Sequence, residues 1–336
     1  MTTRPHSSPL NTHPTRRQLL QAGGLGVAGL SGLVQAQPDT TKLIVPFAPG
    51  ASNDLIARLL AESMTRQTQR TWIVENKPGA GSLLGTEVVA RAAPDGRSLL
   101  LCASANMGIQ PAIRKTMRYD VESDFTFLAR VTTSPFALVV NNNLGTPDFQ
   151  AFVRLAKAKP GSVRVGSAGV GSLGHMGAYL MQALLGVGFN NVPYKGAAQV
   201  LNDLRAGHID ASLVSPSSIA PLLKEGGVKV LAVLDKQRNS LLPDVPASPE
   251  LGQPKLQVVN WWGVAGPAKL PPAVATSLSS GLDKTMADPA FGQKLKDLGL
   301  DPAPLLGPAF AQFVSSDLRA WKTVAQQANI TLDEQG

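Results

Sequence analysis

Short apolar runs alternate with stretches in which apolar residues recur at helical spacing, beginning near residue 40. Runs at 42–45, 71–75 and 98–103 have the length of buried strands. Amphipathic segments at 55–64 and 83–92 lie between them. This strand–helix–strand order predicts an α/β fold with a largely parallel sheet and helices on both of its faces.

The same order begins again after a run at 136–140. A helix starts near Thr146, whose hydroxyl we expect to cap it, and a strand, a glycine loop and a helix follow at 163–185. Further strands are predicted at 191–194, 208–214 and 228–233. A third section opens with a run at 261–265 and continues as helices over 272–286, 288–298 and 308–328. Two α/β lobes followed by a helical tail suggest that the tail returns to the first lobe.

That return requires two strands to cross between the lobes, and such crossings form a hinge. We expect the crossings near 139–141 and 259–263. The predicted organisation is a first lobe made of residues 37–139 plus 260–336 and a second lobe made of residues 140–259.

The first 36 residues have the pattern of an export signal. Arg16 and Arg17 precede an uncharged run over 22–34, which ends in a small-residue cleavage site at Ala36. Paired arginines before a weakly hydrophobic segment favour twin-arginine export. The alternative is an ordinary secretory signal in which the two arginines are incidental. Either predicts a periplasmic protein, cleaved near Ala36.

Charge and cysteine content exclude several classes of protein. Removing the signal takes away three arginines and no acid, which lowers the formal charge from +8 to +5. No Lys/Arg cluster with interleaved aromatic residues is present, so a nucleic-acid partner is not expected. Cys102, the only cysteine, lies in a predicted buried strand and is expected to be an inert core thiol.

The loop that joins the first strand to the first helix has features of an anion site. It lies at the carboxyl end of a parallel strand, where open α/β sheets bind their ligands. Pro46 and Pro49 stiffen it, Gly50 permits unusual backbone angles, and Ser52 or Asn53 can cap the helix. The alternative is that this segment is only a well-capped turn.

A second loop between a strand and a helix contains Gly169, Gly171 and Gly174 in the spacing of a dinucleotide-binding motif. The acidic residue that such a motif needs about 20 positions later is absent. We therefore interpret the loop as an anion cradle of backbone amides and the Ser167 and Ser172 hydroxyls. His175 falls in the first helical turn, where a packing or hydrogen-bonding role is expected.

Other polar residues follow predicted strands. Lys195 could neutralise an anion or be only a solvated charge, while Ser215 and the segment 104–106 could supply hydroxyl and amide groups. No G-x-S-x-G motif and no P-loop occurs. After processing, only His175 and His208 remain among the histidines, and neither has metal-site spacing. These patterns predict a binding protein with no catalytic residue, cofactor or metal.

Together these segments resemble the receptors of the tripartite tricarboxylate transporters, the Bug family. The resemblance rests on motifs in the family's order at 45–50, 74–81, 90–96, 166–175, 192–196 and 242–246. It implies a two-lobed periplasmic-binding-protein fold of type II, the Venus-flytrap type. It also implies that the chain, expected to be a monomer, delivers a small carboxylate to integral-membrane permease subunits.

Within the family the loop after the first strand contacts the carboxylate, and a glycine loop of the second lobe completes the site. With the other strand-end residues, the expected ligand-binding set is Phe47, Ala48, Gly50, Ala51, Ser52, Asn53, Asp54, Ser104, Asn106, Ser167, Ala168, Gly169, Gly171, Ser172, His175, Lys195 and Ser215. Ala51 stands where the family usually has glycine, and Asn53 where it has a small residue. The stretch 110–114 also departs from the family's pattern, so the ligand within the carboxylate class stays open.

Two other functions stay open. Twin-arginine export often serves cofactor enzymes, so a periplasmic oxidoreductase would use the glycine motif at 169–174. A sensor that reports ligand occupancy to a membrane signalling protein would need the same fold and the same site.

Overall fold

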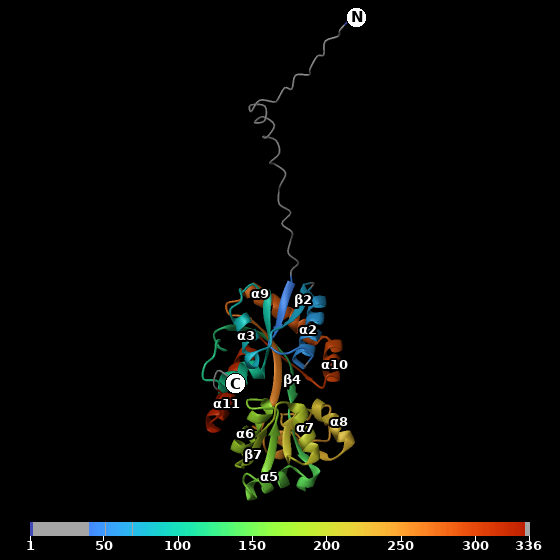
Figure 1. Ribbon diagram of the computed structural model, residues 1–336, viewed down its shortest axis with the longest axis vertical. Coiled ribbons are helices and arrows are strands. Elements are labelled where there is room, and N and C mark those ends of the chain that lie inside the picture. Colours follow the sequence, from blue (N-terminus) through green and yellow to red (C-terminus); the bar gives the residue numbers. More distant parts are fainter. Residues whose placement is uncertain (3–39, 51, 69, 333–336) are drawn as a thin grey trace. The chain divides into compact units, whose positions relative to one another are not determined.

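The computed structural model describes residues 1–2, 40–50, 52–68 and 70–332 of the 336-residue chain. The described residues from Thr40 onward belong to one compact unit (Figure 1). It contains two mixed β-sheets with helices packed on them, which is the α/β class that the sequence predicts. We call each sheet with its helices a lobe. The predicted export signal lies outside the described residues, apart from its first two positions.

The first sheet has six strands in the order β11-β4-β10-β3-β1-β2. Strand β1 runs parallel to β2 and β3, whereas β10 runs antiparallel to β3 and β4, and β11 antiparallel to β4. The strand bounds are β1 Thr40–Val45, β2 Thr71–Asn76, β3 Ser98–Ala103, β4 Phe125–Pro135, β10 Val259–Pro267 and β11 Asp301–Leu306.

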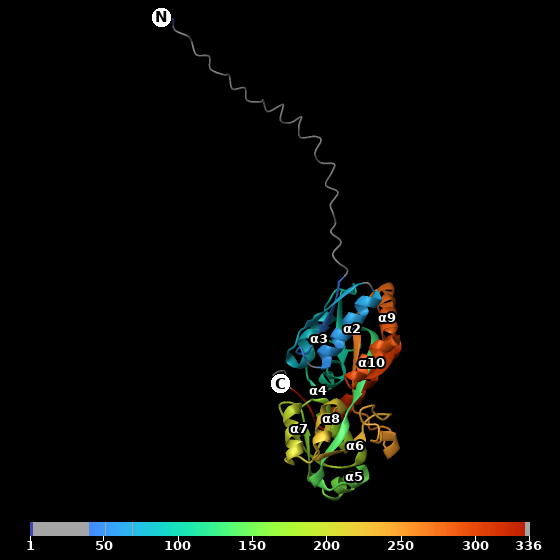
Figure 2. The same cartoon turned by 90° about the vertical axis from the view of Figure 1, so that its right-hand side faces the viewer.

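Helices cover both faces of this sheet (Figure 2). On one face Ile56, Leu60 and Met64, spaced as one helical stripe, pack into the core with residues of α9 and α10. On the other face α3 and α11 pack around Trp261. The helix bounds are α2 Ser52–Thr68, α3 Leu83–Ala90, α4 Gln110–Ile113, α9 Pro272–Ala287, α10 Pro289–Asp297 and α11 Gly307–Gln327.

The second sheet has five strands in the order β7-β6-β8-β5-β9. Strand β6 is parallel to β7 and β8, and β5 is antiparallel to β8 and β9. The bounds are β5 Ala137–Asn141, β6 Val163–Ser167, β7 Phe189–Pro193, β8 Ala211–Val214, β9 Val228–Val233, α5 Phe149–Ala158, α6 Leu173–Leu185, α7 Ala197–Ala206 and α8 Pro216–Glu225.

Neither sheet is largely parallel, so that prediction is wrong for five of the eleven described strands, β4, β5, β9, β10 and β11. The parallel parts are β1-β2-β3 and β7-β6-β8, as the strand–helix order predicts. Strands β5 and β10 each follow a crossing from the opposite lobe, and both run antiparallel to their neighbours.

The chain passes from the first lobe to the second at Phe136, between β4 and β5. Three passages of the chain meet there through backbone hydrogen bonds. Phe136 N–H donates to Val258 C=O (2.8 Å), Val258 N–H to Leu234 C=O (2.9 Å) and Leu234 N–H to Phe136 C=O (2.8 Å). The first crossing therefore precedes its predicted position at 139–141, because those residues are already ladder members of β5. The second occurs at Val258, at the edge of the predicted 259–263.

The helical tail does return to the first lobe, since α9, α10 and α11 contact its sheet or the helices on it. The later part of α11 also reaches the second lobe, which the sequence does not predict. There Trp321 and Val324 share a hydrophobic core with Met176 of α6 and Ile113 of α4. The two lobes thus contact each other through buried apolar side chains as well as through the hinge.

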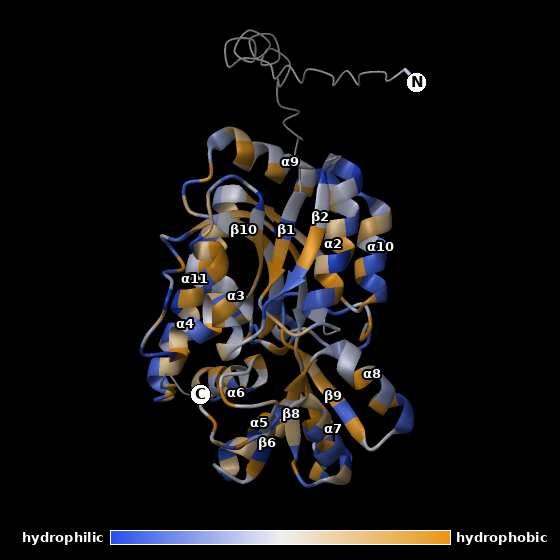
Figure 3. Cartoon of the chain, turned by 45° about the horizontal axis from the view of Figure 1, so that its top comes forward, coloured by the Kyte–Doolittle hydropathy of each residue, from blue (hydrophilic) through white to orange (hydrophobic). Residues whose placement is uncertain are grey.

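Apolar residues line the strands while polar residues alternate along the outer helices (Figure 3). Cys102 lies on β3 with none of its surface exposed, and burial raises the pKa of its thiol. The prediction that Cys102 lies in the core is therefore confirmed, and that its thiol is inert stays a prediction that the raised pKa supports. Among the described helices, none combines the length and apolar character that crossing a bilayer demands.

Candidate functional site

The loop from Val45 to α2 is held by the carboxylate of Asp54, which is 3% exposed. Its Oδ2 accepts hydrogen bonds from Gly50 N–H (3.0 Å) and Arg58 Nε (2.9 Å). The bond from Arg58 is the main reason why the pKa of Asp54 is lowered. The backbone of Gly50 has a φ of +85°, which suits glycine. Asp54 thus fixes the shape of the loop from inside.

Some residues of this loop are exposed to solvent, and others already have their polar atoms in hydrogen bonds within the protein. Ala48, Gly50 and Ser52 are exposed, whereas Ala51 lies outside the described residues. The carbonyl oxygen of Phe47 accepts a hydrogen bond from Asn76 Nδ2 (3.2 Å). The exposed backbone at the start of α2 is the part of this loop that can meet a ligand.

Asn53 is tied to the first sheet, because its Oδ1 accepts a 2.6 Å hydrogen bond from Trp262 Nε1. Trp262 lies on β10, which carries the chain back from the hinge. Asn260, two residues earlier on the same strand, accepts a hydrogen bond from the Ser104 hydroxyl. A row of polar groups thus runs from the loop at 47–54 to the residues next to the hinge.

Ser104 and Asn106 lie in a single π-helical turn, Ser104–Ile109, after β3. Asn106 is fully buried and its amide is committed within the first lobe. Its Oδ1 accepts from Ala103 N–H (2.8 Å), and its Nδ2 donates to the Thr86 hydroxyl (2.9 Å). Its backbone oxygen accepts from the Tyr119 hydroxyl (2.6 Å). Asn106 therefore holds the turn together and offers no free side-chain group to a ligand.

The glycine loop of the second lobe follows β6. Ser167, at the end of that strand, is 3% exposed, and its Oγ has no hydrogen-bond partner within the described part of the chain. Gly169 and Gly171 have φ values of +137° and +74°. A Cβ on Gly171 would lie 2.5 Å from Cδ1 of Ile113 in the first lobe. The loop therefore touches the opposite lobe at a point where both the positive φ and the nearby Ile113 methyl favour glycine.

His175 is in the first turn of α6, as predicted, and is 5% exposed. Its backbone N–H donates to the Ser172 hydroxyl (3.3 Å), and its Nδ1 accepts from Gly171 N–H (3.4 Å). Its ring also packs edge-on against Tyr179, with 5.1 Å between centroids. Burial lowers the pKa of His175, so the ring is neutral near pH 7. This geometry supports the predicted packing and hydrogen-bonding role.

A cavity of about 100 Å³ lies where the ends of β6 and β8 meet the start of α7. Ala168, Ser172 and Ser215 of the predicted set line it. Ser215 precedes α8, and its Oγ lies 2.7 Å from that of Ser218, which also lines the cavity. The helices α6, α7 and α8 all begin beside the cavity. Their N-termini carry partial positive charge, and this arrangement suits an anion.

The structure does not gather every predicted residue into this cavity. Residues 47–54 belong to the other lobe, and Lys195 is exposed, with its backbone N–H bonded to Gln199 Oε1 (3.2 Å). Phe136, at the hinge, also lines the cavity. It was not predicted as a site residue, although it is the first residue of the predicted apolar run at 136–140. Trp262 and Asn260 were also missed, because only the tertiary structure brings them to the first loop.

Gly171 and Gly174 have packing roles in this structure. A Cβ on Gly174 would lie 2.8 Å from the carbonyl oxygen of Leu213, so this glycine lets α6 approach β8 closely. In the described ranges, no three His, Cys, Asp or Glu side chains are grouped so that they could hold a metal ion. The chemistry that the residues offer is hydrogen bonding and helix-dipole attraction to a small anion.

The family model of the tripartite tricarboxylate transporter family receptors matches residues 56–330 of this chain. The protein BugT of Bordetella pertussis is 28% identical over 312 residues, which cover 92% of this chain and 96% of BugT.

Solved structures of similar proteins cover nearly their whole length. A TctC solute-binding protein from Polaromonas, with no ligand, is 28% identical with a TM-score of 0.76, over 86% of this chain and 98% of that one. Rpa4515 of R. palustris with adipate is 26% identical with a TM-score of 0.74, over 88% and 99%. MatC of Rhodopseudomonas palustris with bound malate is 29% identical with a TM-score of 0.67, over 85% and 98%.

Proposed function

Because the chain belongs to the tripartite tricarboxylate transporter family of receptors, we propose that it captures a small carboxylate between its two lobes in the periplasm. It then delivers this ligand to the integral-membrane permease subunits of such a transporter. The chain catalyses no reaction in this proposal, and its residues only bind, orient and enclose the ligand.

The observation that carries the proposal is the meeting of three helix N-termini around one cavity in the second lobe, into which serine hydroxyls also project. Among the described residues that line it, most are apolar, Ser172, Ser215 and Ser218 contribute neutral hydroxyl groups, and none is Lys or Arg. An anion held by dipoles and hydroxyls keeps its contacts without a fixed opposite charge, which favours reversible binding and release.

The first lobe contributes the exposed backbone of Ala48, Gly50 and Ser52 at the start of α2. The side chains of Asn53 and Asp54 position that backbone, because Asn53 accepts a hydrogen bond from Trp262 and Asp54 accepts one from the N–H of Gly50. In this proposal Asn106 supports the fold of the lobe and makes no side-chain contact with the ligand, because its amide is already committed.

Closure of the lobes about Phe136 encloses the ligand. The proposed lobes are those predicted from the sequence, with the first boundary moved from 139 to 136 because β5 belongs to the second sheet. A closed form gains stability from the ligand only if the ligand binds it more tightly than the open form. Contacts from both lobes to one ligand molecule meet that condition.

The ligand class follows from the chemistry of the site and from the ligands of two similar structures. Malate and adipate are both dicarboxylates, and they are bound in proteins 29% and 26% identical to this chain. A second carboxylate can be met by the N-terminus of α2 while the first occupies the cavity of the second lobe. We therefore propose a small dicarboxylate as the ligand.

A thermal-shift screen of mono-, di- and tricarboxylates, followed by calorimetry, tests the function. At least one small dicarboxylate should raise the melting temperature and bind with a Kd of about 1 µM or tighter. Ser215→Ala should weaken that binding about fivefold, the effect of one lost hydrogen bond. Ser162→Ala is the matched control, because Ser162 Oγ bonds only the Lys159 carbonyl on the surface. A folded protein that no carboxylate stabilises would contradict the proposal.

The oxidoreductase alternative depends on the glycine motif at 169–174. Gly174 and Gly171 are accounted for by contacts with Leu213 and Ile113, and a cavity of about 100 Å³ is far smaller than a dinucleotide needs. An absorbance spectrum of the purified protein, and analysis of nucleotide released on denaturation, distinguish the two functions. Bound nucleotide would favour the enzyme.

Export through a signal cleaved near Ala36 is part of the proposal. N-terminal sequencing of the protein recovered from the periplasm tests the cleavage site, and Arg16→Lys combined with Arg17→Lys tests the route. Export that survives both substitutions would indicate the ordinary secretory route. Uptake of the ligand that is lost on deletion of the chain would favour a transport receptor over a sensor.

A further inference from the structure

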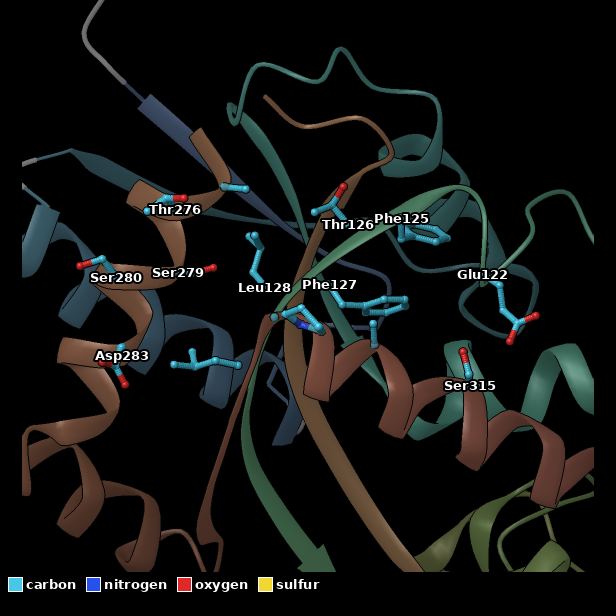
Figure 4. Close-up of a pocket in the computed structure, with 15 residues that line it drawn as sticks. Glu122, Phe125, Thr126, Phe127, Leu128, Thr276, Ser279, Ser280, Asp283 and Ser315 are labelled. Atoms are coloured by element: carbon cyan, nitrogen blue, oxygen red, sulfur yellow. The ribbon is translucent and has the colours of Figure 1, made fainter. Parts of the chain in front are cut away.

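A second and larger cavity, of about 720 Å³, lies on the first lobe (Figure 4). It is formed by the first residues of β4, one side of α9 and the first turns of α11. None of the predicted ligand-binding residues lines it. We call this cavity the β4 groove.

The β4 groove exists because β11 covers only part of the edge of β4. Strand β11 pairs with β4 from Asp301 to Leu306, which lies opposite Ala129. There Gly307, with a φ of +47°, and Pro308 turn the chain into α11. Along β4, Phe125, Thr126 and Phe127 pair with β10 on one side, Leu128 lies at a bulge in that pairing, and no other strand of the described chain pairs with the outer edge of Phe125–Leu128.

An open strand edge presents backbone N–H and C=O groups that another strand can pair with. Four residues of strand span about 13 Å, enough for a short extended segment. The floor of the groove is apolar, since Phe127, Leu128 and Leu306 line it. Hydroxyl groups form its sides, contributed by Thr126, Thr276, Ser279, Ser280 and Ser315.

The charge of the β4 groove is opposite to that of the chain. Among the described residues that line it, Asp283 on α9 and Glu122 on the other side are the only charged ones, and none is Lys or Arg. Figure 4 shows these two acids at opposite ends of the groove. The whole chain carries a net charge of +8, so an acidic groove is unusual on it. Glu122 lies 3.7 Å from Arg319 in an exposed pair, whereas Asp283 has no ion-pair partner in the described ranges.

We propose that the β4 groove binds an extended, basic peptide segment of a partner protein. The segment adds a strand beside Phe125–Leu128, continues the line of β11 and places Lys or Arg side chains against Asp283 and Glu122. Addition of a strand to an open sheet edge obtains affinity from the main chain and specificity from side-chain pockets. This proposal does not depend on the carboxylate receptor function, because the β4 groove and the cavity of the second lobe share no lining residue among those described.

Three dye-labelled peptides test it by fluorescence anisotropy with the purified protein. The probe is Lys-Val-Thr-Val-Thr-Val-Lys, which extends readily and carries a cation at each end. The second peptide has Glu in place of both Lys, which reverses the charge. The third has Pro in place of the two outer Val, which keeps the charge and removes strand pairing. We expect the probe to bind with a Kd below about 100 µM and the other two at least about tenfold more weakly.

Variants of the protein locate the binding. Asp283→Asn with Glu122→Gln should weaken the probe at least about fivefold, because both are exposed acids whose loss leaves the fold intact. Asp244→Asn, which removes an exposed acid in the second lobe, is the matched control and should leave the Kd unchanged. The natural chain, the double variant and the control variant should all show the same thermal shift with the carboxylate ligand. Loss of peptide binding in the β4 groove is therefore separable from loss of the receptor site.

Four results would overturn the proposal. They are no binding of the probe, binding of the Glu peptide as tight as that of the Lys peptide, equal binding of the Pro peptide, and an unchanged Kd in the double variant. The first two contradict a basic occupant, the third contradicts strand addition, and the fourth contradicts the location.

Discussion

Trp262 and Asn53, which are 209 positions apart in the chain, are joined by a hydrogen bond of 2.6 Å from the indole nitrogen to the amide oxygen. Trp262 belongs to β10, which leaves the hinge, and Asn53 is the second residue of α2. The bond therefore couples the crossing strand to the loop that is proposed to meet the ligand. Only 3% of the surface of Trp262 is exposed, so water does not readily replace Asn53.

Asn53→Leu should leave the indole N–H buried without an acceptor. We expect the free energy of unfolding to fall by about 1–3 kcal/mol and the carboxylate affinity to fall with it, because the start of α2 is released. Urea denaturation and calorimetry measure the two effects. The control is Trp262→Phe in the same protein, which removes the donor as well. If Asn53→Leu costs the same with and without the indole N–H, the bond has no role.

Gly171→Ala should disturb the contact between the lobes. The new Cβ would meet Ile113, and the φ of +74° is unfavourable for alanine. Gly186→Ala is the matched control, because Gly186 has a similar φ of +63° and nothing within 4 Å of its Cβ position. Both should lose about 1 kcal/mol of stability from backbone strain, but only Gly171→Ala should also weaken ligand binding. Equal affinities in the two variants would show that the contact does not matter for closure.

His175 should make ligand binding sensitive to acid. Burial lowers its pKa below 6.5, so the stabilising contribution of the neutral ring is complete above pH 6.5 and is lost as the pH falls through the lowered pKa. Protonation of Nδ1 removes the acceptor for Gly171 N–H. Affinity measured from pH 8 to pH 5 should therefore fall at the acid end. His175→Gln keeps an acceptor and does not titrate, so its affinity should change less over the same range. Identical profiles would contradict this role.

Asp317 should lower stability at neutral pH. Burial raises its pKa to about 6, although Trp261 Nε1 donates a 2.9 Å hydrogen bond to its carboxylate. Stability that depends on the protonated form is present below pH 3.8 and is lost as the pH rises through about 6. Asp317→Asn keeps an acceptor and removes the charge, so it should be more stable than the natural chain at pH 7.5, by up to about 3 kcal/mol.

Denaturation of the natural chain and of the Asp317→Asn variant at pH 4 and pH 7.5 checks this. The two should differ little at pH 4, because the carboxyl group is then largely protonated in the folded chain. Ser316→Ala, next to Asp317 on the exposed side of α11, controls for disturbance of the helix. A difference in stability that is the same at both pH values would contradict the assignment to ionisation.

The strand–helix order could be predicted because most elements follow local patterns, but β4 and β11 were missed. Polar residues interrupt the apolar run of β4, and one of them, Thr132, is satisfied by the carbonyl oxygen of Asp301 from the neighbouring strand. Pro302 and Pro304 argue against a strand, and they are tolerated in β11 because it lies at the edge of the sheet. These environments exist only after the sheet has formed.

The residue that caps the N-terminus of α5 could not be predicted from the local sequence either. The predicted cap of the helix near residue 146 was the Thr146 hydroxyl, and that prediction is wrong. The structure begins α5 at Phe149, with Asp148 Oδ1 accepting from Ala151 N–H at 2.7 Å. Both residue types suit the position, and local sequence does not decide between them.

For the candidate site, the sequence indicates which loops lie at strand ends but not which side chains remain free. The sequence predicts Asn106 as a ligand contact, but in the structure its side-chain amide is hydrogen-bonded to Thr86 and Ala103. His175 is correctly placed because a helix start is a local feature. Contacts such as Gly171 with Ile113 join separate lobes, so no local pattern contains them.

The complete burial of Cys102 makes this chain well suited to site-specific labelling. Its thiol is shielded by β3 and its neighbours, and its raised pKa disfavours the reactive thiolate. A cysteine introduced at exposed Ala168 would then be the one thiol that a maleimide dye modifies in the folded protein. Fluorescence from that position would report solute capture in real time, and the chain could serve as a reagentless biosensor without any further engineering of its native cysteine.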